Sequence, residues 1–248
     1  MADLFALFRP LVSFPEGAAA NVMIALRWFH IVAGILWVGM LYFFVLVSSR
    51  FFPALDAPTR ARIYPLLMPR ALWWFRWSSV VTVLVGISYW MHVVTLDAHN
   101  AHASPGRVFW TFFLLWTVAF FVEMAVLMAP APGLHRSEIV VPISLAACAI
   151  AAWIYLSTNN QGWESNRVLA IGIGGGLGWF MMFNVWGLIW RVQKKLIRWH
   201  TENPNGGPLP DKLANLTRAA AVASTVNFIL SFPMLFFMAA ASHYPFLG

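Results

Sequence analysis

One histidine lies inside an otherwise apolar stretch of this 248-residue chain, RWFHIVAGILWVGMLYFF, which runs from Arg27 to Phe44. Placing an imidazole about a third of the way into a bilayer is costly, so such a side chain usually faces the interior of a helix bundle and has a function there. Imidazole is also the commonest metal ligand in proteins. His30 is therefore a candidate ligand of a haem iron.

Three neighbours share a helical face with His30. Gly34, Trp37 and Leu41 follow it at spacings that a helix brings to one side. A glycine one turn from a buried imidazole leaves room for a flat macrocycle or for a neighbouring helix. The pattern favours a haem site that includes Gly34 and Trp37. A histidine bonded to a backbone carbonyl beside a packing glycine would satisfy the same pattern.

The composition is that of an integral membrane protein. Hydrophobic residues make up 60% of the chain and charged residues only 10%, which is more apolar surface than a soluble domain of this length can bury. Six apolar runs each approach the roughly 20 residues that the hydrocarbon core requires. They predict an all-α bundle of six spanning helices, at about 22–47, 76–96, 107–129, 138–158, 167–190 and 216–241. The predicted domains are an N-terminal surface segment, 1–21, and the transmembrane bundle, 22–248.

The basic residues determine the predicted orientation. All but four of the 16 lysines and arginines lie in, or flank, the connections that follow the first, third and fifth apolar runs; the four are Arg9, Arg27, Arg107 and Arg167. The positive-inside rule assigns those connections to the cytoplasm, so both termini are expected to be periplasmic. We expect a multi-pass protein of the bacterial inner membrane. The net charge of +7 is explained by this asymmetry and by contact with membrane lipid, and no nucleic acid is expected as a partner.

With this orientation, five of the seven histidines lie at or near the outer face. His92 is near the outer end of the second span, His99 and His102 follow in the loop, and His243 closes the sixth span. An axial pair of haem ligands must reach the iron from opposite sides at similar depth. We predict that His30 and His92 form that pair. His243 is the alternative partner or the ligand of a second haem, so the expected cofactor is one haem b, or two.

A second polar group lies in the inner halves of three other spans. Glu123, Asn184 and Asn227 belong to the third, fifth and sixth spans, where an unpaired carboxylate is costly. One interpretation is a proton path or a pocket for quinone or substrate, with these three residues as catalytic candidates. The other is an interhelical hydrogen-bond clamp in which Glu123 is protonated. Both interpretations stay open at this stage.

The fifth span contains GIGGGLG, from Gly172 to Gly178. A dinucleotide-binding turn needs a strand before it, whereas these glycines lie within a spanning segment, where their spacing is typical of helix packing. The single cysteine, Cys148, excludes a disulfide within the chain and a cysteine-based metal cluster.

Four segments carry a resemblance to a known family. They are the run around His30, PRALWWFRWSSVVTVLVG (69–86), NVWGLIWRVQKK (184–195) and PMLFFMAAASHYP (233–245). In this order they resemble the membrane domain of bacterial membrane-bound urate oxidase, the cytochrome-c-linked urate hydroxylase family. The His-x3-Gly-x2-Trp-x-Gly pattern also occurs in related haem-linked membrane families, whereas Ser-His-Tyr-Pro near the end is more distinctive. The resemblance implies a multi-helix membrane unit that delivers electrons to a cytochrome c.

Two features depart from that family. Its best-known members carry a fused C-terminal cytochrome c domain, but no Cys-x-x-Cys-His is present here, so we expect any c-type haem to belong to another polypeptide. The sixth span has Val226, Asn227, Phe228 and Ile229 where the family has a His-Asn-x-Tyr pattern. The urate chemistry of the family is therefore not carried over to these positions.

Three hypotheses follow, and the first is preferred. The chain is an integral membrane b-haem redox subunit that passes electrons toward a periplasmic cytochrome c or a c-type cytochrome subunit, with quinone or other respiratory subunits as further partners. Alternatively, it is a membrane-bound urate or purine oxidase, or a cofactor-free structural subunit of a respiratory complex. Whether the chain is itself an oxidoreductase or a subunit of one is left open.

Overall fold

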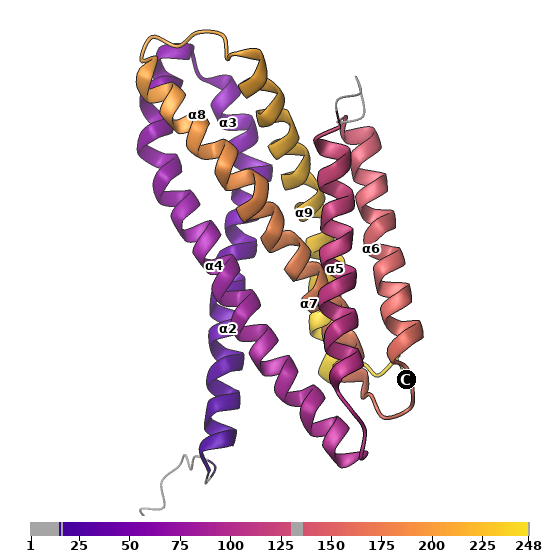
Figure 1. Ribbon diagram of the computed structural model, residues 1–248. Coiled ribbons are helices and arrows are strands. Elements are labelled where there is room, and N and C mark those ends of the chain that lie inside the picture. The colour runs from indigo at the N-terminus through magenta and orange to yellow at the C-terminus, as the bar shows by residue number, and fades with distance from the viewer. Residues whose placement is uncertain (1–14, 16, 130–135, 248) are drawn as a thin grey trace, which may run out of the picture.

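The computed structural model describes residues 15, 17–129 and 136–247, and all regular secondary structure in these ranges is helical. The elements are α2 (Ala18–Tyr42), η1 (Phe43–Ser48), α3 (Ser49–Ala54), α4 (Ala57–Asn100), α5 (Gly106–Leu127), α6 (Ser137–Asn159), α7 (Asn166–Asn184), η2 (Val185–Ile189), α8 (Trp190–Glu202) and α9 (Asp211–His243). Within the described ranges, six helical stretches are long and apolar enough to cross a membrane. The predicted all-α bundle of six spans is confirmed (Figure 1).

Helix α4 is much longer than the span predicted for it. Its 44 residues extend about 66 Å at 1.5 Å per residue, whereas the hydrocarbon core is roughly 30 Å thick. It begins at Ala57 because Asp56 caps it: the Thr59 amide donates to Asp56 Oδ1 at 2.9 Å. The same amide lowers the pKa of the Asp56 carboxyl below its usual range. The helix then continues through Pro65 and Pro69 into the apolar segment.

The fifth span is also extended. Helix α7 continues through the π-helical η2 into α8, which carries four exposed basic residues: Arg191, Lys194, Lys195 and Arg198. In Figure 1, α3, α8 and the first part of α4 lie together at one end of the molecule. This basic end is the one that the charge pattern assigns to the cytoplasm.

Both ends of the described chain lie at the opposite end of the bundle (Figure 1). This arrangement agrees with an even number of spans. The predicted surface segment, 1–21, falls largely outside the described residues, and α2 begins at Ala18.

Helix α7 is the most buried of the spans and packs against α4, α5, α6 and α9. Its glycines receive aromatic side chains from two neighbours. A Cβ atom at Gly172 would overlap the Tyr155 hydroxyl of α6, and one at Gly176 would overlap the Trp116 indole of α5. Gly174 lies against α9. The predicted packing role of this glycine run is confirmed.

The orientation in the membrane gives a first testable prediction. In a chain with Cys148→Ala, a cysteine introduced at the exposed position Lys194 should react with an impermeant thiol reagent only from the cytoplasmic side. A cysteine at Ser104, exposed in the loop after α4, is the matched probe and should react only from outside. The reverse pattern would invert the assignment of both ends of the bundle.

Candidate functional site

His30 reaches from α2 to the backbone of α4. Its Nδ1 donates a hydrogen bond to the Thr82 carbonyl oxygen at 2.8 Å. The ring lies against Gly86, where a Cβ atom would be 2.6 Å from Nδ1 and 2.7 Å from Cε1, so only glycine leaves room for it. Because Nδ1 carries the proton, Nε2 keeps its lone pair. The imidazole is thus oriented as a metal ligand usually is.

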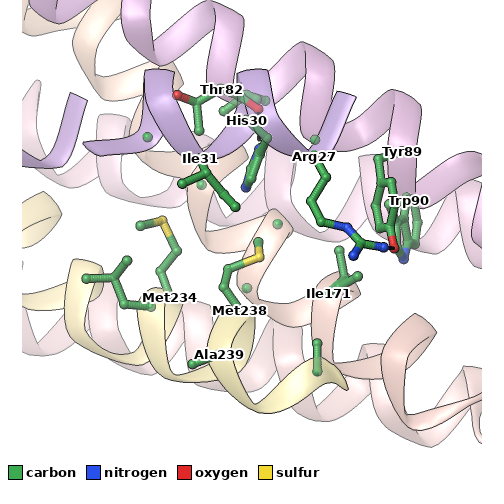
Figure 2. Close-up of a pocket in the computed structure, with 18 of the residues that line it drawn as sticks. Arg27, His30, Ile31, Thr82, Tyr89, Trp90, Ile171, Met234, Met238 and Ala239 are labelled. Atoms are coloured by element: carbon green, nitrogen blue, oxygen red, sulfur yellow. Dashed lines mark hydrogen bonds between the residues drawn. The ribbon is translucent and has the colours of Figure 1, made fainter. Parts of the chain in front are cut away.

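This imidazole lines a cavity of about 820 Å³. The cavity lies between α2 and α4 on one side and α7 and α9 on the other. Figure 2 shows the His30 ring directed into this space, with Met234 and Met238 on α9 at the facing wall. The volume falls in the range of roughly 300–1,000 Å³ that is typical of ligand and cofactor pockets.

The walls of the cavity are apolar and partly without side chains. Six glycines line it: Gly34, Gly39, Gly86, Gly174, Gly175 and Gly178. Two buried indoles, those of Trp37 and Trp90, also line the cavity, and Trp90 is held by a hydrogen bond from Nε1 to the Val168 carbonyl at 3.0 Å. An apolar cavity of this size, into which the Nε2 side of an imidazole is directed, is compatible with a haem that is bound through histidine.

Four of the predicted cofactor residues line this cavity together, and one does not. His30, Gly34, Trp37 and His243 line it, whereas His92 is exposed on α4 and lies outside it. His92 is six residues beyond Gly86, which turns it about 120° away from the helix face that meets His30. The hydropathy pattern indicates the depth of His92 but not its face. His30 and His92 are thus not brought to one cavity.

His243 is the last residue of α9 and lies at the mouth of the cavity. The tail that follows it is held by Asn166, whose Nδ2 donates to the Ala241 carbonyl at 3.1 Å and whose Oδ1 accepts from the Phe246 amide at 3.1 Å. His243 also lines an adjoining hollow of about 400 Å³. The Ser-His-Tyr-Pro segment is thereby fixed at the opening. The remaining outer histidines, His99 and His102, are exposed and line neither hollow.

The second polar group forms one buried cluster. Glu123, Asn184 and Asn227 are fully buried, and Asn184 Nδ2 donates both to Glu123 Oε2 at 2.8 Å and to Asn227 Oδ1 at 2.9 Å. Asn227 Nδ2 donates to the Met181 carbonyl at 3.0 Å. The cluster joins α5, α7 and α9 but lines neither hollow. This geometry favours the clamp, and a catalytic role for the three residues stays a prediction.

The clamp gives a second testable prediction. Glu123→Gln keeps an oxygen that can accept from Asn184, so we expect haem content and electron-transfer rate to stay unchanged and stability to change by about 1 kcal/mol or less. Asn184→Leu leaves two buried acceptors without their donor and should cost about 2–6 kcal/mol, at roughly 1–3 kcal/mol for each. Thermal unfolding followed by tryptophan fluorescence measures both. A slower rate in Glu123→Gln at normal haem content would instead indicate proton transfer.

Several residues of the cavity were not predicted from the sequence. Gly86, Met234 and Met238 line it from α4 and α9, and Arg27 and Arg167 line its outer part from α2 and α7. The two arginines could have been identified as candidate site residues from the sequence, because they are among the few basic residues on the side predicted to be outer. The glycine and the methionines carried none, since such residues are common in any apolar helix.

The described part of the chain offers no group of three or more His, Cys, Asp or Glu residues that could hold a bare metal ion. The ligands predicted from the sequence, His30, His92 and His243, do not form such a group.

Comparison with known proteins identifies the family. The chain matches the family described as urate oxidase N-terminal over residues 56–248. The match includes Gly86, His243 and the Glu123 cluster, whereas α2 with His30 precedes it. No curated protein and no solved structure matches the chain. The resemblance expected from the sequence is confirmed, and the chain belongs to the urate oxidase N-terminal family.

Proposed function

We propose that this chain is a haem-b-bearing membrane redox subunit that passes electrons toward a cytochrome c on the outer side of a bacterial inner membrane. The observation that carries the proposal is the His30 imidazole. Its Nδ1 is held by the Thr82 carbonyl and its ring faces an apolar cavity of about 820 Å³. Haem b, when bound there, supplies one-electron redox chemistry.

The residues around the cavity have separate roles in this proposal. His30 would hold the haem iron, and Thr82 and Gly86 fix the position of its ring. The buried indoles of Trp37 and Trp90 would exclude water from the haem. Further candidate ligands lie on α9, where His243 lines the opening and two methionines line the wall.

The position of the cavity supports an outer partner. His243 and Arg167 line both the cavity and the adjoining hollow at the end of the bundle where the described chain terminates. The charge pattern predicts that this end faces outward. A redox centre close to that surface suits a c-type cytochrome on the same side. The electron donor is a quinone or another respiratory subunit in this proposal.

The absorption spectrum of the purified chain tests the proposal. We expect a reduced-minus-oxidised spectrum of a low-spin b-type haem and one haem per chain in the pyridine haemochrome assay. Reduction of added cytochrome c should depend on this haem. A purified, folded chain without haem would contradict the proposal and favour a cofactor-free structural subunit.

Membership of the family favours a second candidate function, the oxidation of urate or a related purine by the chain itself. In this case the cavity beside His30 would bind the purine. The Glu123 cluster does not line that cavity, so it would act only by holding α7 and α9, which form part of the cavity wall, in position. Urate-dependent reduction of the haem or of cytochrome c by the purified chain separates the two functions. Reduction by urate supports the oxidase, and reduction by a quinol alone supports the electron-transfer subunit.

A further inference from the structure

Two arginines line the cavity that contains His30, and among the residues that the structure describes no aspartate or glutamate lines it. Arg27 comes from α2 and Arg167 from α7. Only four of the 16 basic residues lie on the side predicted to be outer, and these are two of them. Positive-inside topology disfavours basic residues there. Their place in the cavity wall calls for a specific explanation.

Arg27 is held at the cavity by Tyr89 of α4. Its Nη2 donates to the Tyr89 hydroxyl at 2.9 Å, and its guanidinium lies 5.2 Å from the centre of the Tyr89 ring. Figure 2 shows the side chain extended along the cavity wall toward Tyr89. An arginine that only reached for the lipid headgroups would need neither contact. Arg27 lies three residues before His30, about 4.5 Å nearer the outer end of the helix.

Arg167 is positioned by the start of α7. Ser165 caps this helix, since its hydroxyl accepts from the Val168 amide at 3.3 Å, and Asn166 binds the C-terminal tail. The half-buried Arg167 is thus in the first turn of a fixed helix. The positive end of the helix dipole also favours an anion at this place.

In the described part of the chain, no carboxylate lies within 4 Å of either guanidinium. There the ion pair within 4 Å is Arg198 with Glu202, at the other end of the molecule. Asp97 lines the adjoining hollow together with Arg167 but does not pair with it. Arg27 is exposed and Arg167 is half-buried. Beside an apolar cavity in a membrane, a ligand that brings negative charge stabilises such cationic groups.

We infer that Arg27 and Arg167 bind the two propionate carboxylates of the haem. This inference rests on the proposed function. The residues that would bind the carboxylates then lie on the outer side of His30, because Arg27 precedes it by three residues in α2 and Arg167 is in the first turn of α7. Guanidinium groups suit carboxylates because their donors match both oxygens. The unusual outer position of the two arginines is thereby explained by the ligand.

The rate of haem loss from the purified full chain to excess apomyoglobin tests the inference. Arg27→Gln and Arg167→Gln should each release haem about 10- to 100-fold faster, the factor that a hydrogen bond to a charged group contributes. Arg107→Gln is the matched control, because Arg107 is exposed at the same end and lines neither hollow. Its haem loss should equal that of the unmodified chain.

A second arm needs no variant to fold. The unmodified chain is loaded with haem or with haem dimethyl ester, in which both carboxylates are masked. We expect the ester to be released about 10-fold faster than haem, or more, because neither arginine can then bind a carboxylate. Equal release of haem and ester would overturn the inference and leave the proposed haem function standing. A chain that binds neither compound would overturn the proposed function itself.

Discussion

Replacing His30 by Ala is expected to abolish the haem absorption of the purified chain while leaving it inserted in the membrane. His30 offers the one imidazole on the α2 and α4 side of the described cavity, and its Nδ1 bond to Thr82 shows that Nε2 is the free nitrogen. Insertion depends on the apolar spans, which the substitution does not alter. The measurement is the ratio of haem absorption to protein in the purified, monodisperse chain.

His92→Ala is the matched control for this substitution. His92 lies on the neighbouring helix, six residues beyond Gly86, but is exposed and outside the cavity. The variant should keep the full low-spin spectrum. Complete haem loss in His92→Ala with normal absorption in His30→Ala would show that the cavity is not the haem site. Haem would then bind at the exposed face of α4 that carries His92.

His243→Ala separates two ways of completing the coordination. The residue is exposed at the mouth of the cavity, whereas Met234 and Met238 lie on the wall that faces His30 in Figure 2. A change from a low-spin to a high-spin spectrum in His243→Ala would identify it as the second axial ligand. An unchanged spectrum would exclude His243 and leave the two methionines as the candidates on α9; a methionine ligand raises the potential of a haem.

The six-helix bundle could be predicted because an apolar segment of about 20 residues is long enough to cross a membrane as a helix. The six runs coincide with the six helical stretches that can span it. The helix starts were less predictable: the second span was expected from residue 76, but α4 begins at Ala57 and continues through Pro65 and Pro69. Hydropathy identifies the part of a helix that contacts lipid. The more polar first part of α4, before residue 76, is stabilised by the Asp56 cap and by tertiary contacts, such as the hydrogen bond that the Tyr64 hydroxyl donates to Gln193 Oε1 at 2.6 Å.

The candidate site was predictable in part for a related reason. A polar residue deep in an apolar run is visible in the sequence, so His30 and the cluster of Glu123, Asn184 and Asn227 could be identified. His92 does not line the cavity that contains His30, because depth in the membrane does not define which face of a helix a residue occupies; the pairing of the two histidines stays a prediction. The contact of His30 with Gly86 is between two different helices, so it could not be predicted from the spacing of residues in the sequence.

Gly86→Ala should remove most of the bound haem, although every ligand remains present. The added Cβ would lie 2.6 Å from His30 Nδ1 and 2.7 Å from Cε1, where ordinary van der Waals contact begins near 3.4 Å. The ring must therefore move away from α4 and lose its bond to the Thr82 carbonyl. An imidazole that can rotate freely binds a metal less well, and loss of such an orienting contact typically costs about 10–100-fold in affinity.

Gly34→Ala is the control for Gly86→Ala. Its Cβ would meet the Thr82 methyl at 3.6 Å, an ordinary contact, and both glycines line the same cavity. We expect Gly34→Ala to retain nearly all its haem. If both variants lost haem equally, the smooth wall of the cavity rather than the position of His30 would be the feature that matters. If Gly86→Ala retained its haem, His30 would have to bind iron without the contact that orients it, and its assignment as the axial ligand would fail.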